Sequence, residues 1–447
     1  MENSKFIVYQ MLPRIVGKFG TINDNMLSYL KDMGVTYIWY TGIIRHATPP
    51  DPTVKGNCGS PYAISDYYDV NPYLANNPQR RMDEFEELAE RTHENGLKLL
   101  IDFVPNHTAA NYIGKHREFT DENYYPGHIH DGDWTDTAKL NYSNPDTRTK
   151  MLEILLFWAS KGVDGFRCDM VELVPLDFWS WAIPKVKSSY PDTIFIGEAY
   201  TPSNYPGLFD IGKFDYLYDK SGFYDTLKRI VRGEGSATEL TGCWQSLGPY
   251  APKMLNFLEN HDEVRVGSEE FAGSPYRAIS ALFVSLFFNT CPFMIYFGQQ
   301  FGEGPDKTSI FDFCTLPSIE AWKRGLEEGE AEKYLEYTDR DLRRVYNTYL
   351  KVATQDKAFR DGKTFDLQYA NPHTADYNPH RQFAFLRSYA RTVYLCVANF
   401  EDRDVVLKIN IPASAFDYMG IVRSESVNPE TPISIKVTRN AGHIIEL

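Results

Sequence analysis

The sequence predicts a (β/α)8 TIM barrel with a short insertion after the third strand and a C-terminal antiparallel β domain. Three observations indicate this α/β fold class: apolar runs alternate with amphipathic segments, eight such runs are short enough for strands, and the pattern changes near residue 360. Strands separated by helical crossovers form parallel sheets that are covered on both faces. Eight βα units in about 350 residues suit a closed barrel, with an open doubly wound sheet as the alternative.

The eight predicted strands are, in order, FIVYQML, YIWYTGII, LKLLIDFV, GFRCDM, TIFIGEAY, FDYLYD, MLNFLENHD and PFMIYFGQ. The segments between them show helical periodicity. In NDNMLSYLKDMG, Met26, Leu27 and Leu30 recur at helical spacing, and Gly34 stands at the stop. The segment MDEFEELAERTHENG follows the same pattern and leads directly into the third strand.

The predicted domain division follows the change of pattern. Residues 1–357 are expected to form the barrel domain, with residues 108–145 as a polar, irregular insertion. Residues 358–447 contain the short alternating runs FAFLRSY, TVYLCVANF, DVVLKINIP and SIKVT. These runs are separated by turn residues, and no helix is predicted between them. Such runs are typical of a small antiparallel β domain.

Composition and charge exclude several classes of protein. With 43% hydrophobic and 24% charged residues, the chain can bury a substantial core and is not expected to be disordered. A net charge of −14 argues against nucleic acid and against an anionic membrane surface as partners. The start MENSKFIVYQ lacks an export-signal pattern, and the six scattered cysteines are expected as reduced buried thiols. These features predict a cytoplasmic protein without a membrane span.

The segment GFRCDM carries two charged residues in an otherwise apolar strand. Alternate side chains of a strand share a face, so Arg167 and Asp169 point one way and Cys168 and Met170 the other. A neighbouring Arg keeps a carboxylate ionised and oriented. The pair is therefore either part of an active site at the barrel mouth or a structural ion pair that closes it.

Three further predicted strands also end in polar residues. Glu198 ends the fifth strand, His261 and Asp262 end the seventh, and Asn106 and His107 end the third. The carboxyl ends of barrel strands form one active-site face. Carboxylates with flanking imidazoles, without a GxSxG elbow, a phosphate-binding glycine loop or zinc-type spacing, favour glycoside chemistry. Cleaving an acetal requires a proton for the departing oxygen and negative charge near an oxocarbenium-like transition state.

The segments IDFVPNH, GFRCDM, FIGEAY and FLENHD occur in this order. Together they resemble the four signature regions of the alpha-amylase family of glycoside hydrolases, family 13. SPYAISDYYDVNP at residues 60–72 is similar to the family's segment after the second strand. The resemblance covers most of residues 6–320, and a β domain after the barrel is also the family's usual arrangement.

The resemblance implies roles for the three carboxylates. Asp169 would be the nucleophile that forms a β-glycosyl intermediate, and Glu198 the general acid and then base. Asp262 would hold sugar hydroxyls and favour the distorted ring. A retaining enzyme needs its nucleophile and its acid/base about 5 Å apart, which adjacent barrel strands can supply.

The same resemblance implies supporting residues. Arg167 would orient the nucleophile, and Asp102 would be a structural partner of Arg167. His107 and His261 would form hydrogen bonds to the sugar, and Tyr62 would stack on it. No cofactor is implied for the chemistry.

The chain departs from many family members just after the predicted nucleophile. Many family members have Lys and His at the third and fourth positions after the nucleophile, where this chain has Glu172 and Leu173. That Lys is associated with the sugar beyond the cleavage point, so the product pattern stays open. A structural calcium ion is also common in the family, held by the residue that corresponds to Asn106 and by residues of the insertion. The other ligands are not assigned, and the acidic residues of the insertion, Asp121, Glu122, Asp131, Asp133 and Asp136, are equally expected as solvated surface carboxylates.

The sequence therefore predicts a retaining glycosidase that cleaves α-glucosidic bonds, chiefly α-1,4 bonds, in maltodextrins or starch-derived oligosaccharides. The first alternative is an α-glucan glycosyltransferase or a sugar isomerase that uses the same site. A more remote alternative is a catalytically inactive, amylase-like binding protein. Inactive relatives typically lack a catalytic carboxylate, whereas Asp169, Glu198 and Asp262 are all present here.

Overall fold

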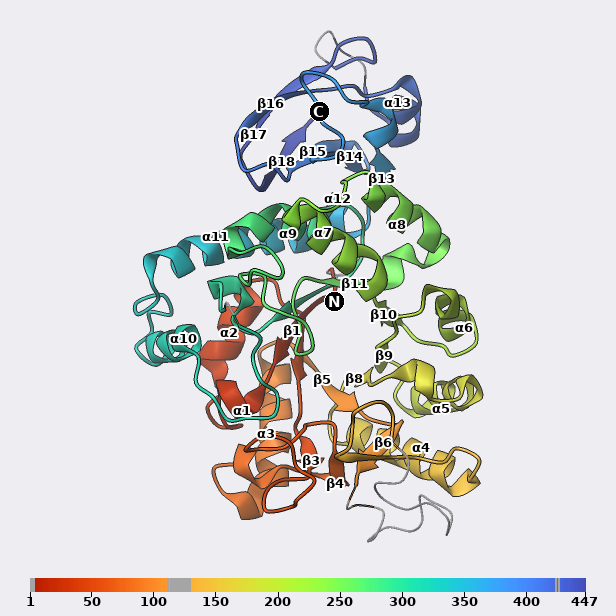
Figure 1. The fold of residues 1–447 in the computed structure, drawn as a ribbon, viewed down its shortest axis with the longest axis vertical. Coiled ribbons are helices and arrows are strands. Elements are labelled where there is room, and N and C mark those ends of the chain that lie inside the picture. Colours follow the sequence, from red (N-terminus) through yellow and green to blue (C-terminus); the bar gives the residue numbers. More distant parts are fainter. Residues whose placement is uncertain (1–4, 111, 113–129, 305, 423, 425–426) are drawn as a thin grey trace. The chain divides into compact units, whose positions relative to one another are not determined.

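A computed structural model describes residues 5–110, 112, 130–304, 306–422, 424 and 427–447. The eight predicted strands form a closed parallel barrel in the described part of the chain, in the order β1-β12-β11-β10-β9-β8-β5-β2 (Figure 1). Their bounds are β1 (Ile7–Met11), β2 (Tyr37–Tyr40), β5 (Lys98–Phe103), β8 (Gly165–Cys168), β9 (Ile194–Gly197), β10 (Tyr216–Tyr218), β11 (Met254–Phe257) and β12 (Phe293–Tyr296). The predicted fold class is confirmed, and the open doubly wound sheet is excluded.

The chain divides into two compact units. The first unit consists of residues 8–218 and 309–335, and the second of residues 1–7, 219–308 and 336–447. Strands β2, β5, β8, β9 and β10 and most of β1 belong to the first unit, and β11, β12 and the C-terminal strands belong to the second. The boundary predicted between residues 357 and 358 stays a prediction.

In the first unit, neighbouring strands are paired in parallel, which aligns the predicted site residues. Asp102 of β5 is opposite Arg167 of β8, and Cys168 is opposite Gly197 of β9. Asp169 and Glu198 therefore follow the ends of two paired strands. Helices lie along the outside of these strands (Figure 1). The helices of this unit are α1 (Pro13–Val16), α2 (Asp24–Asp32), α3 (Arg81–Glu94), α4 (Pro145–Ser160), α5 (Leu176–Ser189), α6 (Tyr205–Asp210) and α10 (Pro317–Glu327).

Helix α2 illustrates how the sequence sets these elements. The Asn23 side chain accepts a hydrogen bond from the Met26 N–H and so caps the helix. Met26, Leu27 and Leu30 are buried, as their spacing predicted. Gly34, with a φ of 103°, then allows the chain to turn away from the helix towards β2.

Two short antiparallel ladders accompany the barrel strands of the first unit. Strand β3 (Ile44–His46) pairs with β4 (Ile64–Val70), and β6 (His107–Ala109) pairs with β7 (Thr137–Lys139). The second ladder shows that the insertion, predicted as irregular, contains ordered strand structure at both of its ends. Residues 111 and 113–129 of the insertion, which include Asp121 and Glu122, lie outside the described residues.

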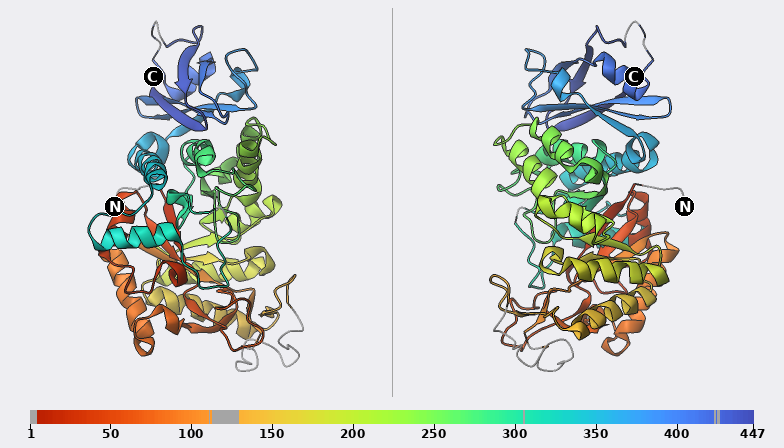
Figure 2. Two further views of the ribbon diagram at one scale, coloured as in Figure 1. Left: turned by 60° about the vertical axis from the view of Figure 1, so that its left-hand side comes forward. Right: turned by 90° about the vertical axis from the view of Figure 1, so that its right-hand side faces the viewer.

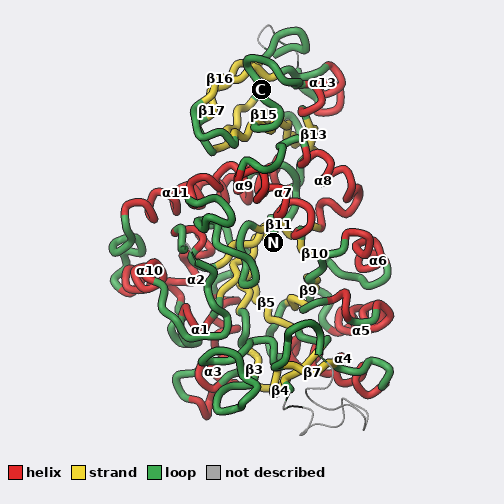
Figure 3. The backbone as a smooth tube through the Cα atoms, viewed as in Figure 1, coloured by secondary structure: helices red, strands yellow, loops and turns green. Residues whose placement is uncertain are grey.

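The second unit contains the antiparallel sheet β13-β14-β15-β18 and the separate pair β16–β17. The paired strands run side by side in both views of Figure 2, and Figure 3 shows the strands joined by loops. The bounds are β13 (Lys363–Asp366), β14 (Gln382–Tyr389), β15 (Thr392–Asn399), β16 (Val405–Ile409), β17 (Ile433–Val437) and β18 (Ala441–Glu446). The helices are α7 (Asp225–Arg232), α8 (Glu239–Leu247), α9 (Ile279–Phe287), α11 (Tyr337–Gln355), α12 (Lys357–Arg360) and α13 (Ala413–Met419).

Helix α13 corrects one expectation, because no helix was predicted between the C-terminal strands. Ala415, Phe416 and Met419 recur at helical spacing and are buried in the same apolar cluster as Leu386 and Leu395 of the sheet. The helix is short, so its periodicity is a weak signal in the sequence.

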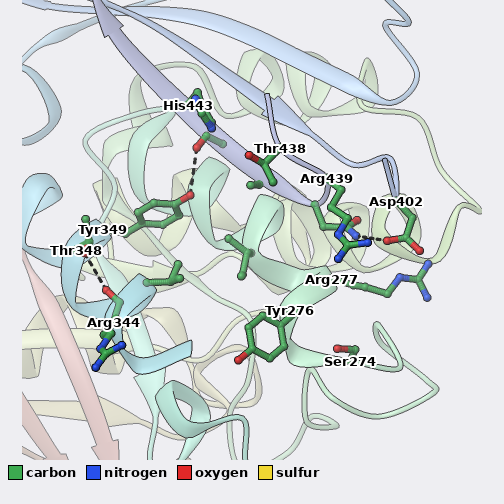
Figure 4. Close-up of a pocket in the computed structure, with 15 residues that line it drawn as sticks. Ser274, Tyr276, Arg277, Arg344, Thr348, Tyr349, Asp402, Thr438, Arg439 and His443 are labelled. Carbon is green, nitrogen blue, oxygen red and sulfur yellow. Dashed lines mark hydrogen bonds between the residues drawn. The ribbon is translucent and has the colours of Figure 1, made fainter. Parts of the chain in front are cut away.

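Surface features of the second unit include a cavity of about 710 Å³ (Figure 4). Three arginines that are far apart in the sequence, Arg277, Arg344 and Arg439, help to line it, together with Tyr276 and Tyr349. None of the predicted site residues lines this cavity. Within the described residues, no helix is both long and apolar enough to cross a membrane. All six cysteines are free.

A buried histidine of the first unit gives a prediction for the pH dependence of stability. Burial, together with the smaller effect of the nearby Arg14 guanidinium, lowers the pKa of His46 from 6.5 to about 3, although a hydrogen bond to the Ala47 carbonyl opposes the shift. Arg14 Nη2 lies 2.7 Å and the Tyr73 hydroxyl 2.9 Å from Nε2 of His46. His46 is therefore neutral in the folded protein at neutral pH.

Between pH 6.5 and about 3, the unfolded chain binds a proton at His46 and the folded chain does not, so stability falls as the pH falls. From pH 7 to pH 5 this costs about 2 kcal/mol. Urea unfolding at both pH values should show that His46→Gln reduces the pH-dependent loss by about this amount, whatever its effect at pH 7. The exposed His373, changed to Gln, should keep the wild-type loss. An unchanged loss in His46→Gln would contradict the prediction.

Candidate active site

One arginine holds two of the predicted catalytic carboxylates. Arg167, on β8, has a side chain that is only 1% exposed. Its Nη1 lies 2.8 Å from Oδ1 of Asp169, and its Nη2 lies 2.8 Å from Oε1 of Glu198. The structure therefore brings these three residues together, as predicted, at the carboxyl ends of adjacent strands. Charge-assisted contacts of this length fix both carboxylates to one rigid plane.

Aromatic rings surround the same guanidinium. The ring centres of Trp39, Tyr62 and Tyr218 lie 5.2, 5.3 and 5.6 Å from its central carbon. Nε of Arg167 also donates a hydrogen bond of 3.2 Å to the Tyr218 hydroxyl. These cation–π contacts and the hydrogen bond restrict the side chain on several sides. Trp39 and Tyr218 were not predicted as site residues.

Asp102 supports this arrangement from β5. Its Oδ1 is 3.6 Å from Nη1 of Arg167 and accepts a hydrogen bond of 3.3 Å from the Tyr62 hydroxyl. Its Oδ2 accepts from Trp39 Nε1 at 3.2 Å and from the Gly42 N–H at 3.0 Å. Burial raises the pKa of Asp102 to about 6, and Arg167 and the hydrogen bonds limit this rise. The predicted contact between Asp102 and Arg167 is present.

Asp169 has one anchored and one available oxygen. Oδ1 is bound by Arg167, whereas Oδ2 is buried and accepts no hydrogen bond from the described residues. Nε2 of His107 lies 3.9 Å from Oδ2. Burial raises the pKa of Asp169 well above its usual value, and the nearby Glu198 charge raises it further, while Arg167 opposes both effects.

His107 is a neutral residue in this site. It is buried, and burial lowers its pKa to about 4. Asn106 Nδ2 lies 3.2 Å from its Nδ1 and thereby helps to fix the ring. Tyr62, predicted to stack on a sugar, has its ring beside Arg167 and its hydroxyl on Asp102. The roles of His107 and Tyr62 in binding sugar stay predictions.

Glu198 is also bound by residues that were not predicted. The Met170 N–H donates a hydrogen bond of 2.9 Å to Oε2, and the Tyr200 hydroxyl donates one of 2.6 Å to Oε1. Met170 has a φ of 43°, which is uncommon for a residue with a side chain and indicates local backbone strain next to Asp169. Tyr200 lies two residues after Glu198, so strand periodicity could have placed both side chains on one face.

His261 and Asp262 belong to the second unit, where they follow β11. Nε2 of His261 lies 3.1 Å from Oδ2 of Asp262, whose side chain is 41% exposed. The N–H groups of Asp262 and Glu263 each donate a hydrogen bond of 2.8 Å to Oδ1 of Asn260, which fixes this turn. The catalytic role of Asp262 and the sugar-binding role of His261 stay predictions.

The described residues at Asn106 do not by themselves make a calcium site. Asn106 Nδ2 donates a hydrogen bond of 2.8 Å to Asp131, whose other oxygen is 2.7 Å from Nζ of Lys139. This carboxylate is thus already paired with a cation. Within the described residues, no group of three His, Cys, Asp or Glu side chains could hold a metal ion. Calcium binding stays a prediction.

The fold and this cluster define the class of protein: a TIM-barrel enzyme with paired carboxylates at the ends of its strands. A family model described as the alpha-amylase catalytic domain matches residues 12–137 and 128–211. The chain is thus similar to the alpha-amylase family of glycosidases.

Individual relatives agree with this similarity. Alpha-amylase 3 of Dictyoglomus thermophilum is 26% identical over 404 residues, which cover 78% of this chain and 75% of the relative. An alpha-1,4-glucan:maltose-1-phosphate maltosyltransferase of Picrophilus torridus is 28% identical over 254 residues, or 51% of this chain and 37% of the relative. The crystal structure of the noncanonic maltogenic alpha-amylase AmyB from Thermotoga neapolitana aligns with a TM-score of 0.73 and 23% identity, over 100% of this chain and 97% of that one. This structural likeness supports the fold.

Proposed function

We propose that the protein is a retaining glycosidase that cleaves α-1,4-glucosidic bonds in maltodextrins or starch-derived oligosaccharides. The observation that carries this proposal is the shared guanidinium. Arg167 holds Asp169 and Glu198 within 2.8 Å of its two terminal nitrogens, and Oδ2 of Asp169 remains without a hydrogen bond in the described chain. Two carboxylates held this close together suit a retaining enzyme, in which they lie about 5–5.5 Å apart, rather than an inverting one.

In the proposed first step, Oδ2 of Asp169 attacks the anomeric carbon while Glu198 transfers its proton to the departing glycosidic oxygen. The bond to the leaving sugar breaks, and a β-glycosyl ester of Asp169 forms. In the second step, Glu198 removes a proton from water, which attacks the anomeric carbon and releases Asp169. Two inversions restore the α configuration. Asp262 is proposed to hold sugar hydroxyls, and the proposed chemistry needs no cofactor.

The charges of the site suit these steps. Arg167 keeps a positive charge beside Asp169, which favours the ionised form that a nucleophile needs. Asp169 and Glu198 are each less than a tenth exposed, and this burial strengthens the electrostatic interactions among the charged groups of the site. The choice of α-1,4 bonds is supported by the relative named as an alpha-1,4-glucan:maltose-1-phosphate maltosyltransferase.

A second candidate, an α-glucan glycosyltransferase, uses the same intermediate. A sugar hydroxyl would then replace water in the second step. The similarity to a relative named as a maltosyltransferase supports this second candidate. A sugar isomerase would also use this intermediate, but no contact of the described residues favours it.

Incubation with maltooligosaccharides from maltose to maltoheptaose tests the proposal. We expect shorter products only, and nuclear magnetic resonance should show that the newly formed reducing ends are α-anomers before mutarotation. Products longer than the substrate would assign the transferase. A β-anomer as the first product would contradict the retaining mechanism, and no cleavage of any member would contradict the glycosidase proposal.

A further inference from the structure

Glu172 occupies the position where many family members carry a lysine, but its carboxylate is already engaged within the protein. Oε2 accepts a hydrogen bond of 2.8 Å from the Tyr200 N–H, and Oε1 accepts one of 2.7 Å from Nδ2 of Asn204. The Thr201 N–H lies 3.2 and 3.3 Å from the two oxygens. Glu172 thus binds the loop that follows β9, and both of its oxygens are occupied.

Glu172 and Asp169 lie on the same short segment, so these contacts connect the loops after two neighbouring strands. The Met170 N–H donates to Oε2 of Glu198, and the Val171 N–H donates to the Glu198 carbonyl at 3.2 Å. The segment can make these contacts because Met170 adopts a left-handed conformation with φ 43° and ψ 51°. Backbone strain of this kind is retained where the surrounding contacts enforce it.

The contacts of Glu172 hold Tyr200 next to Glu198. Its backbone N–H is held by Glu172, and its hydroxyl donates a hydrogen bond of 2.6 Å to Oε1 of Glu198. Oε1 also lies 2.8 Å from the positively charged guanidinium at Nη2 of Arg167. Oε2 accepts a hydrogen bond from the neutral Met170 N–H. A positive charge in contact with Oε1 disfavours a proton there, so an added proton is placed on Oε2, which still has a free lone pair.

We propose that Glu172 and Tyr200 position the proton of the acid/base Glu198. Tyr200, together with Arg167, fixes the proton of Glu198 on Oε2, and Glu172 holds the loop that keeps Tyr200 in place. Both are positioning residues, since they act through Glu198. The inference rests on the proposed function, in which Glu198 protonates the leaving oxygen. It also explains the departure at Glu172: the side chain organises the acid/base instead of binding the sugar beyond the cleavage point.

The leaving group provides the test. A sugar is a poor leaving group and needs the proton, whereas 4-nitrophenolate leaves almost without it. We expect Tyr200→Phe to lower kcat/KM for maltoheptaose about 10- to 100-fold. For nitrophenol release from 4-nitrophenyl α-maltotrioside, the loss should be less than about threefold. KM for maltoheptaose should change little. The control Tyr349→Phe also removes a half-buried hydroxyl that donates to a backbone carbonyl, and it should leave kcat/KM for both substrates unchanged.

Glu172→Gln provides the second arm, because its amide group cannot accept hydrogen bonds through both atoms. We expect its loss of kcat/KM to depend on the leaving group in the same way. In the double variant Tyr200→Phe/Glu172→Gln, the fold-loss of kcat/KM should be much smaller than the product of the two single fold-losses, because both residues act through Glu198. Glu172→Asp, which keeps the charge, should retain more activity than Glu172→Gln.

Other outcomes overturn the inference in recognisable ways. Equal losses on both substrates would show a general structural role for Tyr200. A raised KM for long substrates with unchanged kcat in Glu172→Gln would show that Glu172 binds sugar. In both cases the wild-type enzyme would still cleave maltoheptaose, so the proposed function would stand. A wild-type protein without glycosidase activity would overturn both.

Discussion

Replacing Asp169 by asparagine should lower kcat for maltoheptaose by about four orders of magnitude or more while the protein stays folded. An amide cannot attack the anomeric carbon, so no glycosyl ester forms. The substitution preserves the size of the side chain, and the amide oxygen can still accept the hydrogen bond from Nη1 of Arg167, now 2.8 Å long. Product release from maltoheptaose, measured with wild-type and variant at equal concentration, checks the loss.

The matched control is Asp177→Asn, because Asp177 is 71% exposed on α5 and pairs only with Arg148 among the ion pairs of the described residues. This variant should keep wild-type turnover. Undiminished hydrolysis by Asp169→Asn would refute the nucleophile assignment. The truncation Asp169→Gly gives a second test: added azide should occupy the vacated space, displace nitrophenolate from an activated α-glycoside and yield a β-glycosyl azide. An α-azide would contradict direct displacement at this position.

The barrel and the central part of the site could be predicted because both depend on short-range patterns. Each of the eight strands is a short apolar run that the structure buries in the barrel. Arg167 and Asp169 are two residues apart in one strand, so periodicity alone places them on one face. Parallel pairing then brings Glu198 beside them, because it follows the neighbouring strand. Fold class and the cluster around Arg167 thus follow from alternation and strand order.

Several other contacts of the first unit could not be predicted in the same way. Glu172 reaches Tyr200 because Met170 adopts a left-handed backbone conformation. Glycine or asparagine would indicate such a conformation in a sequence, but methionine does not. Trp39 contacts Arg167 from another strand, and apolar runs reveal burial but not the partner. The insertion contained a strand pair that a polar composition conceals. Such features depend on tertiary contacts, which local patterns do not encode.

Replacing Arg167 by methionine should destabilise the protein by about 3–5 kcal/mol at pH 7, in addition to abolishing activity. Arg167 is the cation that contacts Asp102, Asp169 and Glu198, and all four residues are buried. Without the guanidinium, these carboxylates lose their partner in a region where burial already raises the pKa of Asp102 to about 6 and that of Asp169 well above its usual value. Denaturant unfolding of wild-type and variant measures the difference.

The pH dependence of this difference identifies its cause. When folding raises the pKa of a carboxyl group, the folded protein becomes less stable as the pH rises. The loss begins at the pKa in the unfolded chain, near 4, and continues up to the pKa in the folded protein. The cost of Arg167→Met should therefore be small near pH 4.5 and grow towards pH 8. Asp169→Asn removes one buried charge, so it should partly restore the stability of Arg167→Met, whereas Asp177→Asn should not. A cost that is the same at every pH and unaffected by Asp169→Asn would indicate lost packing around the side chain, and would exclude charge balance as the main role of Arg167 in stability.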